Sequence, residues 1–359
     1  MGSVRVTAND VAKAAGVSQP TVSRVFNRST AVDPAKAERV RAVARELGYI
    51  PNLVARSLNS GSSFRIGIVL AFLKNGFFGE ALQQLSKALN AQGYSVTVYF
   101  AGNRSEEVEA IVDDLLADQV DGIILASISL SNELVSRVRK SGIPCVLFNR
   151  GQRDPDASVV AASNFEGGRQ ATEFLINAGH KRIAHLAGWR EAMNGVDRKN
   201  GFLAAMEAAG LEPVACADCH FRRNVAMEET RRLFSLSDTP DAIFAANDHM
   251  AFGVLEVLRE ELGLRVPEDV SVIGYDDEPK ASWKTFDLTT VRQPLTRMVS
   301  ATTKLLLDEI RDPERPPKKI EIPGELIVRG SARLPDGQKR SASETAPHDQ
   351  DSDVPGDRT

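Results

Sequence analysis

Residues 7–27 read TANDVAKAAGVSQPTVSRVFN and indicate two short helices joined by a tight turn. Thr7 is a residue type that caps helices, and Asp10 three positions later completes the pattern of a capping box. Gly16 ends the first helix, because a tight turn needs the backbone freedom that glycine supplies at low cost. Ser18 can cap the second helix, whose first turn tolerates the proline that follows.

The second of these helices separates apolar from polar side chains. Its inward positions are apolar: Val22, Val25 and Phe26. Its outward positions are polar: Gln19, Thr21, Ser23, Arg24 and Asn27. A glycine turn between two short helices, the second carrying polar groups outward, is what helix-turn-helix recognition of DNA requires. The alternative is an amphipathic helix pair that only packs against another part of the chain.

Charge is unevenly distributed along the chain. The net charge of the 359 residues is −4, yet residues 1–60 hold nine Lys and Arg against four Asp and Glu, so they carry +5 and the rest −9. A basic end on an acidic body is typical of a protein that contacts a polyanion locally. The composition predicts an ordinary soluble chain of two or three domains. We see no apolar membrane span and no signal peptide, and we expect a cytoplasmic protein.

The three cysteines are an odd number, which favours free thiols: Cys145, Cys216 and Cys219. Residues 216–220 read CADCH, the C-x-x-C-H pattern of covalent haem attachment, and the pattern also fits half of a metal site. Tetrahedral zinc needs four ligands, and no second Cys/His pair lies near in the sequence. We therefore interpret the motif as a chance occurrence and expect neither metal nor cofactor.

A third helix and a hinge follow the helix pair. Asp33 and Pro34 mark the start of the helix, with proline in the first turn, and Gly48 ends it. Residues 52–59, NLVARSLN, form a short amphipathic run before Ser-Gly-Ser-Ser at 60–63. This run is too short to be a stable helix alone, so it is interpreted as a hinge that orders on contact with a partner.

From Phe64 onward, short apolar runs alternate with amphipathic stretches. This alternation predicts βαβ units and an α/β fold built on doubly wound parallel sheets. The rhythm restarts after a connection at 154–163, so we expect two α/β lobes with a cleft between them. The tail from 335 to 359 is polar and without periodicity, which predicts disorder. The expected strands are 66–70, 95–100, 122–126, 145–148, 183–186, 242–245 and 270–275, and the expected helices 78–91, 106–117, 132–140, 167–177, 197–209, 225–234 and 249–261.

Taken together, these segments resemble the LacI/GalR family of bacterial transcription regulators over about residues 4–334. The order and spacing of the matching pieces carry the resemblance more than any one piece does. The matching pieces are VTANDVAKAAGVSQPTVSRVFN (6–27) in the headpiece, GYIPNLVARSL (48–58) in the hinge, AIFAANDHMAFGVLEVLRE (242–260) and VPEDVSVIGYDD (266–277) in the core, and TTVRQP (289–294) and GELIVRGSAR (324–333) in the closing segments.

The resemblance implies a helix-turn-helix headpiece on a two-lobed core similar to periplasmic binding proteins, with three strands crossing between the lobes. It also implies a homodimer on a palindromic operator, because a two-fold symmetric protein matches two-fold symmetric DNA. The tail shows no leucine heptads, so we expect a dimer rather than a tetramer. The expected bounds are 1–50 for the headpiece, 51–63 for the hinge helix and linker, 64–334 for the core (N-lobe about 64–160 and 292–325, C-lobe about 162–290) and 335–359 for the tail.

By the resemblance, Gln19, Pro20 and Arg24 lie where the family contacts base edges. Glutamine pairs with adenine and arginine with guanine, whereas proline offers only apolar contact, for instance to a thymine methyl. The other polar candidates are assigned to phosphates, with a solvated helix face or a cap as the alternative: Thr7, Ser18, Thr21, Ser23 and Asn27.

In the hinge, Leu58 aligns with the leucine that family members insert into the minor groove, where an apolar side chain kinks the duplex. Without the resemblance, this leucine would be interpreted as a core or interface residue. With the resemblance, Val54, Ala55 and Arg56 would pair the two hinge helices or reach phosphate, and Asn52 is a further candidate for contacting DNA.

Ligands in this architecture bind between the lobes, near the carboxyl ends of the strands. Arg198 matches the effector-binding arginine of the family, and its five donors suit hydroxyls or a carboxylate. Asp276 can accept two hydrogen bonds from a sugar-like ligand. The candidate effector-binding residues are Phe78, Asn149, Asn164, Arg198, Phe221, Asn247 and Asp276.

Structural alternatives stand beside these assignments. Phe77 is expected to pack in the core rather than to touch a ligand. Asp248 is as suited to capping a helix as to binding a ligand, and Asp276 can stabilise a turn. Ser163 and Asn149 stand where the family often has aspartate. Fewer carboxylates in the pocket suggest an effector that carries fewer hydroxyls or is itself acidic, such as a sugar acid.

We therefore expect an effector-controlled, sequence-specific DNA-binding regulator, most often a repressor in this family. A solute-binding protein of a transporter would explain two lobes but leaves residues 1–60 without a role. An enzyme is not favoured, because the chain has no P-loop, no G-x-G-x-x-G after the first strand and no G-x-S-x-G. The spacing of His180, His185 and His220 suggests no catalytic base.

Overall fold

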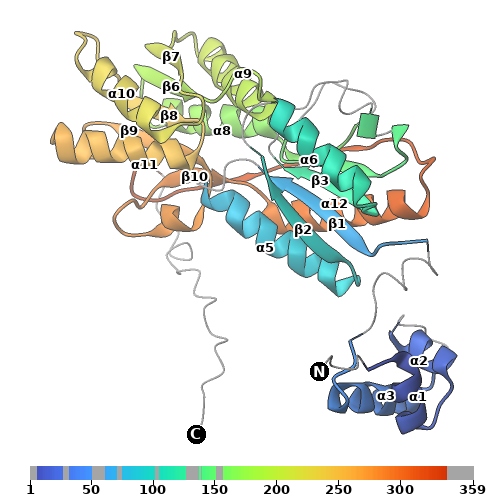
Figure 1. The fold of residues 1–359 in the computed structure, drawn as a ribbon. Coiled ribbons are helices and arrows are strands. Elements are labelled where there is room, and N and C mark those ends of the chain that lie inside the picture. The colour runs from blue at the N-terminus through green and yellow to red at the C-terminus, as the bar shows by residue number, and fades with distance from the viewer. Residues whose placement is uncertain are drawn as a thin grey trace, which may run out of the picture. The chain divides into compact units, whose positions relative to one another are not determined.

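A computed structural model describes residues 6–26, 32–50, 61–70, 75–101, 105–126, 137–138, 140–150 and 157–337. The chain divides into two compact units, Met1–Phe64 and Arg65–Thr359 (Figure 1). Six of the headpiece and hinge candidates lie outside the described residues: Asn27, Asn52, Val54, Ala55, Arg56 and Leu58. So do most of the helix expected at 132–140 and the tail from 338 onward.

The first unit holds three helices around a small apolar core. The helices are α1 (Ala8–Ala15), α2 (Gln19–Phe26) and α3 (Pro34–Glu46). The predicted capping box is present, because the Thr7 hydroxyl accepts from the Asp10 N–H and the Asp10 carboxylate accepts from the Thr7 N–H at 2.9 Å. Gly16 ends α1 at φ 62°, the left-handed conformation that glycine adopts without strain. Their buried side chains are Val11, Ala12, Ala15, Val22, Val25, Ala37, Val40 and Ala44.

The second unit contains two six-stranded sheets, each covered by helices on both faces. In the N-lobe sheet the order is β11-β5-β4-β3-β1-β2, and every neighbouring pair is parallel. Its strands β1, β3 and β5 are buried almost throughout, as strands covered on both faces must be. The N-lobe elements are β1 (Arg65–Leu70), α5 (Gly76–Ala91), β2 (Ser95–Phe100), α6 (Ser105–Ala117), β3 (Gly122–Ala126), β4 (Cys145–Phe148), β5 (Ser158–Ala162), α12 (Leu295–Arg311) and β11 (Lys319–Ile322).

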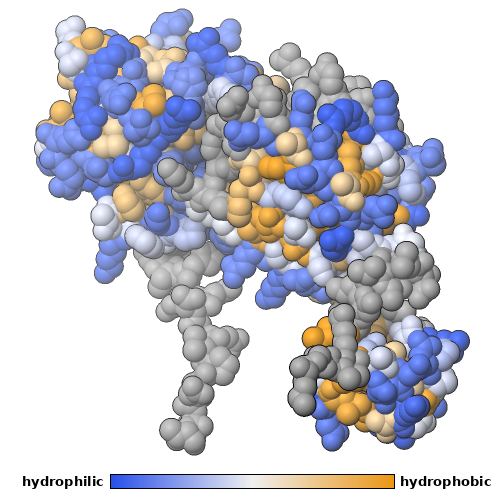
Figure 2. All heavy atoms as spheres, viewed as in Figure 1, coloured by the Kyte–Doolittle hydropathy of each residue, from blue (hydrophilic) through white to orange (hydrophobic). Residues whose placement is uncertain are grey.

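In the C-lobe sheet the order is β12-β10-β9-β8-β6-β7, and only β12 runs antiparallel to its neighbour. In the view of Figure 2, hydrophilic residues cover most of this lobe, whereas more apolar surface shows on the N-lobe. The C-lobe elements are α8 (Asn164–Asn177), β6 (Ile183–Ala187), α9 (Met193–Ala208), β7 (Ala215–Asp218), α10 (Arg223–Phe234), β8 (Ala242–Ala245), α11 (Asp248–Glu256), the π-helix Val257–Glu261, β9 (Ser271–Asp276), the 3-10 helix Pro279–Ser282, β10 (Thr289–Arg292) and β12 (Glu325–Ile327).

The chain passes between the two sheets at three places. It leaves the N-lobe after β5, returns after β10 to form α12 and β11, and leaves again to form β12. Each lobe is therefore built from segments far apart in the sequence. Among the described helices, none is long and apolar enough to cross a membrane.

The structure differs from the sequence-based expectations in four places. The connection expected at 154–163 contains strand β5, and strand β7 was not anticipated, because its sequence ACAD has little of the β-branched character of strands. The helix expected at 249–261 changes to a π-helix at Val257. At the start of the tail, Pro335 is buried rather than disordered.

Candidate functional site

A cavity of about 620 Å³ opens between the two lobes. It lies beyond the carboxyl ends of β4, β6, β8 and β9, which is where ligands bind in open α/β sheets. Most of the residues that line it are polar, and two are phenylalanines: Asn75, Phe78, Asn149, Asn194, Arg198, Phe221, Arg222, Arg223, Asn224, Asn247, His249 and Asp276. The structure thus brings together six of the seven predicted effector residues.

Arg198 on α9 is the most extensively bound side chain in this cavity, and it is only 2% exposed. Its Nε donates to Asn164 Oδ1 at 2.8 Å and its Nη1 to the Ala246 carbonyl at 2.6 Å. The guanidinium carbon lies 3.6 Å from the ring centroid of Tyr275, a cation–π contact. These contacts hold the guanidinium in one orientation.

Helix α9 can place Arg198 here because α8 crosses it closely. A Cβ on Gly168 would lie 2.2 Å from the Arg198 carbonyl oxygen, and one on Gly201 would lie 2.0 Å from the Phe165 carbonyl oxygen. Only glycine leaves room for two helix backbones at this separation. The two glycines therefore set the depth at which the arginine lies.

Asp276 ends β9 with φ 119° and is 5% exposed. Its Oδ1 lies 3.4 Å from Arg198 Nη1, and both carboxylate oxygens also accept amide hydrogen bonds, from Gln293 at 2.7 Å and from Asn75 at 2.8 Å. Burial raises the pKa of Asp276, while the charge of Arg198 and these hydrogen bonds oppose the shift. The carboxylate is thus largely engaged within the protein.

Asn149 contributes an unused acceptor. It is 2% exposed, lines the cavity, and its Oδ1 accepts no hydrogen bond from any residue that the structure describes. A buried polar atom without a partner costs free energy, so this oxygen is suited to a ligand hydroxyl or N–H. Its backbone φ of 54° is a conformation that asparagine tolerates better than most residues.

Phe221 is held by a strained loop. His220 and Phe221 have φ values of 54° and 57°, uncommon for residues other than glycine. The Phe221 ring packs closely on the backbone of Gly188, since a Cβ on Gly188 would lie 2.2 Å from the ring. A Cβ on Gly195 would lie 3.1 Å from the same ring. Strain of this kind concentrates at functional sites.

Hydrogen bonds join the lobes beside the cavity, and two of them involve the start of α5. Asn75 of the N-lobe donates to Asp276, and the Gly76 N–H donates to Glu278 Oε2 at 2.5 Å. Burial raises the pKa of Glu278 to about 7, the hydrogen bond from Gly76 opposes this shift, and the charge of Asp276 adds to it. Opening of the cleft would break both contacts.

Asn164 does not line the cavity, although it was predicted to bind the effector. It donates to the Ala162 carbonyl at 2.9 Å and accepts from Arg198, so it positions the arginine instead. Ser163 does not line the cavity either. The presence of serine at position 163, where the family often has aspartate, therefore says less about the effector than we inferred from the sequence.

The structural alternatives for neighbouring residues are also resolved. Phe77 packs in the N-lobe core, as expected. Asn247, not Asp248, caps α11 by accepting from the Met250 N–H at 2.9 Å. Asp248 is fully buried and accepts from Thr290 Oγ1 at 2.6 Å, and burial raises its pKa well above the usual value.

Sequence reasoning missed several lining residues: Asn75, Asn194, Arg222, Arg223, Asn224 and His249. Asn75 could have been found, because it caps α5 just after the first strand of the sheet. Arg222, Arg223 and Asn224 lie at the start of α10, shortly after strand β7. Because β7 was not anticipated, their position at the cavity could not be predicted.

In the first unit, the candidate DNA-contacting residues lie on or before α2. Ser18, Gln19, Pro20 and Arg24 are exposed, and Thr21 and Ser23 are half-buried. The hydroxyls of Ser18 and Thr21 lie 2.9 Å apart and share a hydrogen bond. Thr7 is exposed but engaged in its capping box.

Other candidate chemistry has structural explanations. Cys216 and Cys219 are free thiols, and the described residues contain no group of side chains that could hold a metal ion. His185 is stacked between Phe202 and Phe244, and burial lowers its pKa to about 3.

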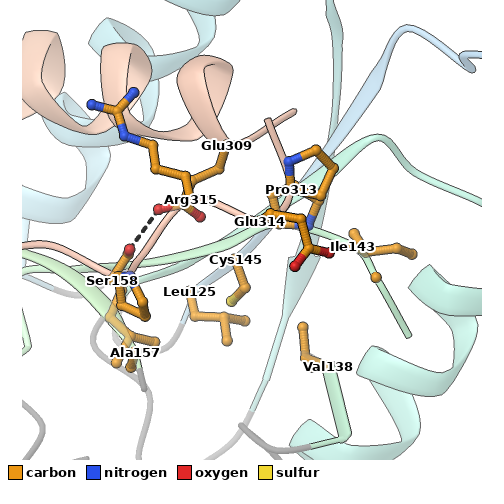
Figure 3. A pocket seen from close by; sticks show the side chains of 14 residues that line it. Leu125, Val138, Ile143, Cys145, Ala157, Ser158, Glu309, Pro313, Glu314 and Arg315 are labelled. Atoms are coloured by element: carbon orange, nitrogen blue, oxygen red, sulfur yellow. Dashed lines mark hydrogen bonds between the residues drawn. The ribbon is translucent and has the colours of Figure 1, made fainter. Parts of the chain in front are cut away.

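A smaller cavity of about 260 Å³ lies in the N-lobe near Cys145 (Figure 3). Ser158 donates there to Glu309. Burial raises the pKa of the Cys145 thiol to about 12, so the thiol stays protonated and unreactive.

Comparison with known proteins agrees with both units. Residues 7–52 match the model of bacterial regulatory proteins of the lacI family, and residues 172–332 match a periplasmic binding protein-like domain. The chain is 35% identical over 330 residues to the HTH-type transcriptional repressor PurR of Vibrio vulnificus, covering 91% of this chain and 98% of that protein. It is 36% identical over 338 residues to the HTH-type transcriptional regulator CelR of Thermobifida fusca, with the same coverage.

Solved structures give the same result. A lac repressor dimer bound to operator and the anti-inducer ONPF is similar with a TM-score of 0.79 and 29% identity, over 91% of this chain and 99% of that one. A CelR–cellobiose complex is similar with a TM-score of 0.70 and 34% identity, over 91% and 100%. With its helix-turn-helix unit, two parallel-sheet lobes and polar cleft, the chain belongs to the LacI family of bacterial regulatory proteins.

Proposed function

We propose that this chain is a transcriptional repressor that binds a palindromic operator as a homodimer and is controlled by a small sugar-like or sugar-acid effector in the cleft between its lobes. The observation that carries the proposal is the polar cavity around Arg198 and Asp276, in a chain that also holds a helix-turn-helix unit. We place its action in the cytoplasm, where bacterial DNA lies.

The exposed face of α2 supports the DNA half of the proposal. Gln19 and Arg24 are exposed on this helix, while Val22 and Val25 on the opposite side are buried. Glutamine and arginine can each make two hydrogen bonds to a purine in the major groove. The positive charge of residues 1–60 supplies the attraction to phosphates. We retain the hinge candidates, Leu58 above all, for the minor groove.

The inter-lobe contacts support the effector half. A ligand that touches Phe78 and Asn149 on one lobe and Arg198 and Asn247 on the other favours the closed arrangement over the open one. A ligand shifts such an equilibrium only through this difference in affinity. Similar proteins bind small molecules of this class, since one solved relative holds cellobiose and another holds ribose.

Selection of bound duplexes from a random DNA pool tests the proposal, followed by a ligand panel on the selected site. We expect a palindrome to be enriched, and one class of sugar or sugar acid to change its affinity. If no palindrome is enriched, the proposal is wrong.

A pair of variants refines this test. Arg24→Gln removes a charge from α2 and is expected to relax the preference at one base pair of each half-site, at a cost of about 1–3 kcal/mol. Arg41→Gln removes the same charge from the exposed face of α3, where Arg41 pairs with Glu38. It is expected to leave the selected sequence unchanged. Equal changes in both variants would contradict the role of Arg24.

A further inference from the structure

We propose that the effector carries an anionic group, and that Arg222 binds it together with the N-terminal backbone N–H groups of α10. The inference rests on the proposed function and names the chemical class of its effector. Arg222, Arg223 and Asn224 all line the inter-lobe cavity, so the N-terminus of this 12-residue helix opens onto it.

The positive groups of the cavity are not equally available. Arg198 is engaged by Asn164, Ala246 and Asp276, and Arg223 pairs with Glu256 of α11. The exposed side chain of Arg222, by contrast, has no hydrogen bond or ion pair within the described part of the chain. Its fork of donors is the arrangement that binds carboxylates and phosphates with two hydrogen bonds.

The start of α10 adds donors to this cation. The N-cap residue is Arg222 itself, and no side chain accepts from the first turn. The first N–H groups of a helix have no acceptor within it, and the helix dipole favours a negative charge at this end. An anion placed here meets backbone donors and a guanidinium at once.

The remaining lining independently points to a bound ligand. Asn149 lines the same cavity, and its buried Oδ1 accepts no hydrogen bond from the described residues, so a ligand donor that reaches this oxygen would satisfy it. The carboxylate of the cavity, Asp276, already accepts from Asn75 and Gln293 and lies beside Arg198. A ligand with one hydroxyl at Asn149 and an anionic group at Arg222 matches both ends of the cavity. The hydroxyls of a neutral sugar can also accept from Arg222, but they lack the charge-assisted hydrogen bonds that an anion makes there.

Calorimetric titration of the full chain tests this inference, with glucose, galactose and ribose and with the carboxylate and phosphate derivatives of each. We expect one anionic derivative to bind at least roughly tenfold more tightly than its neutral parent, as charge-assisted hydrogen bonds allow. Preference for the carboxylate or for the phosphate decides which anion the site takes. Raising the salt concentration should weaken the preference. If each neutral sugar binds as tightly as its derivatives, or if no anionic derivative binds, the inference is wrong.

Two matched variants locate the effect. Arg222→Gln is expected to abolish the preference for the anion, so that an anionic derivative and its neutral parent bind with similar affinity, and Arg222→Lys to restore part of the preference. Arg231→Gln removes the same charge from the same helix, where Arg231 pairs with Glu261 away from the cavity. It should leave the preference intact, and equal losses in both glutamine variants would overturn the assignment. Operator selection with wild-type protein separates the two proposals, because an enriched palindrome together with a neutral effector leaves the proposed function standing.

Discussion

The two walls of the inter-lobe cavity are built differently. The C-lobe wall carries the charged groups, and contacts within that lobe fix its central arginine, Arg198, against Asn164, Ala246 and Tyr275. The N-lobe wall supplies two amides and one aromatic ring, Asn75, Asn149 and Phe78. Contacts within the C-lobe thus fix its arginine, whereas Asn149 Oδ1 on the N-lobe wall has no hydrogen-bond partner among the described residues. Three predictions test this difference.

The largest effect is expected from Arg198→Met. Removing the guanidinium leaves Asp276 and Asn164 without their buried partner, so the free energy of unfolding should fall by about 3–5 kcal/mol. Denaturant unfolding of the wild type and the variant at the same pH measures the loss. Asn149→Gly on the opposite wall is the control.

This control should change the free energy of unfolding by about 1 kcal/mol or less. Asn149 Oδ1 has no partner to lose among the described residues, and glycine adopts the backbone φ of 54° without strain. Effector affinity should still fall. If Asn149→Gly destabilises the chain as much as Arg198→Met does, the two walls are equally fixed and the comparison is wrong.

The next largest effect is expected from Glu278, which accepts a hydrogen bond from the Gly76 N–H of the opposite lobe. Burial raises the pKa of Glu278 from 4.5 to about 7, so the stability that the protonated carboxyl provides is fully present below pH 4.5 and is lost as the pH rises through 7. Glu278→Gln keeps an acceptor for Gly76 and does not titrate. Between pH 4.5 and pH 8, the free energy of unfolding of the wild type should therefore fall by about 3 kcal/mol relative to that of this variant.

Parallel denaturant titrations of wild type and Glu278→Gln at several pH values measure this difference. Groups that titrate equally in both proteins cancel in it. A constant difference between the two proteins across this range would show that Glu278 is not buried between the lobes in solution.

The smallest effect is expected from a pair of glycine substitutions. Gly201→Ala places a Cβ 2.0 Å from the Phe165 carbonyl oxygen, so α8 and α9 must separate, at a cost of about 1–3 kcal/mol. Gly79→Ala lies within α5 with nothing within 4 Å of the added Cβ, and it should stabilise the chain by about 0.5–1 kcal/mol. Thermal unfolding with effector titration checks both. Stabilisation by Gly201→Ala would mean that the crossing is looser than described.

The sequence was sufficient for features that depend on local pattern. The capping box at Thr7 and the strands Ser95–Phe100 and Gly122–Ala126 follow from nearest-neighbour chemistry and hydrophobic periodicity, and their observed bounds match the expected ones. The family resemblance supplied Arg198 and Phe221, which no local pattern distinguishes from other residues of their type.

Features that depend on distant partners could not be predicted. Asn164 supports Arg198 34 positions away, and Asn75 meets Asp276 across 201 positions. Whether an amide contacts a ligand or another side chain is decided by the tertiary contacts of its backbone, and these are not encoded in its neighbours. The strand β7 was missed for a similar reason, because pairing with β6 makes a strand of a weak local sequence.

The three passages of the chain between the lobes have a consequence for protein synthesis. The edge strands β11 (Lys319–Ile322) and β12 (Glu325–Ile327) belong to different sheets and follow all the other described strands along the chain. A polypeptide that stops before residue 319 lacks both, and it exposes the unpaired edges of β5 and β10, which attract other strands. An interrupted translation product is therefore damaged in both lobes at once. Exposed strand edges of this kind make such a fragment prone to aggregation.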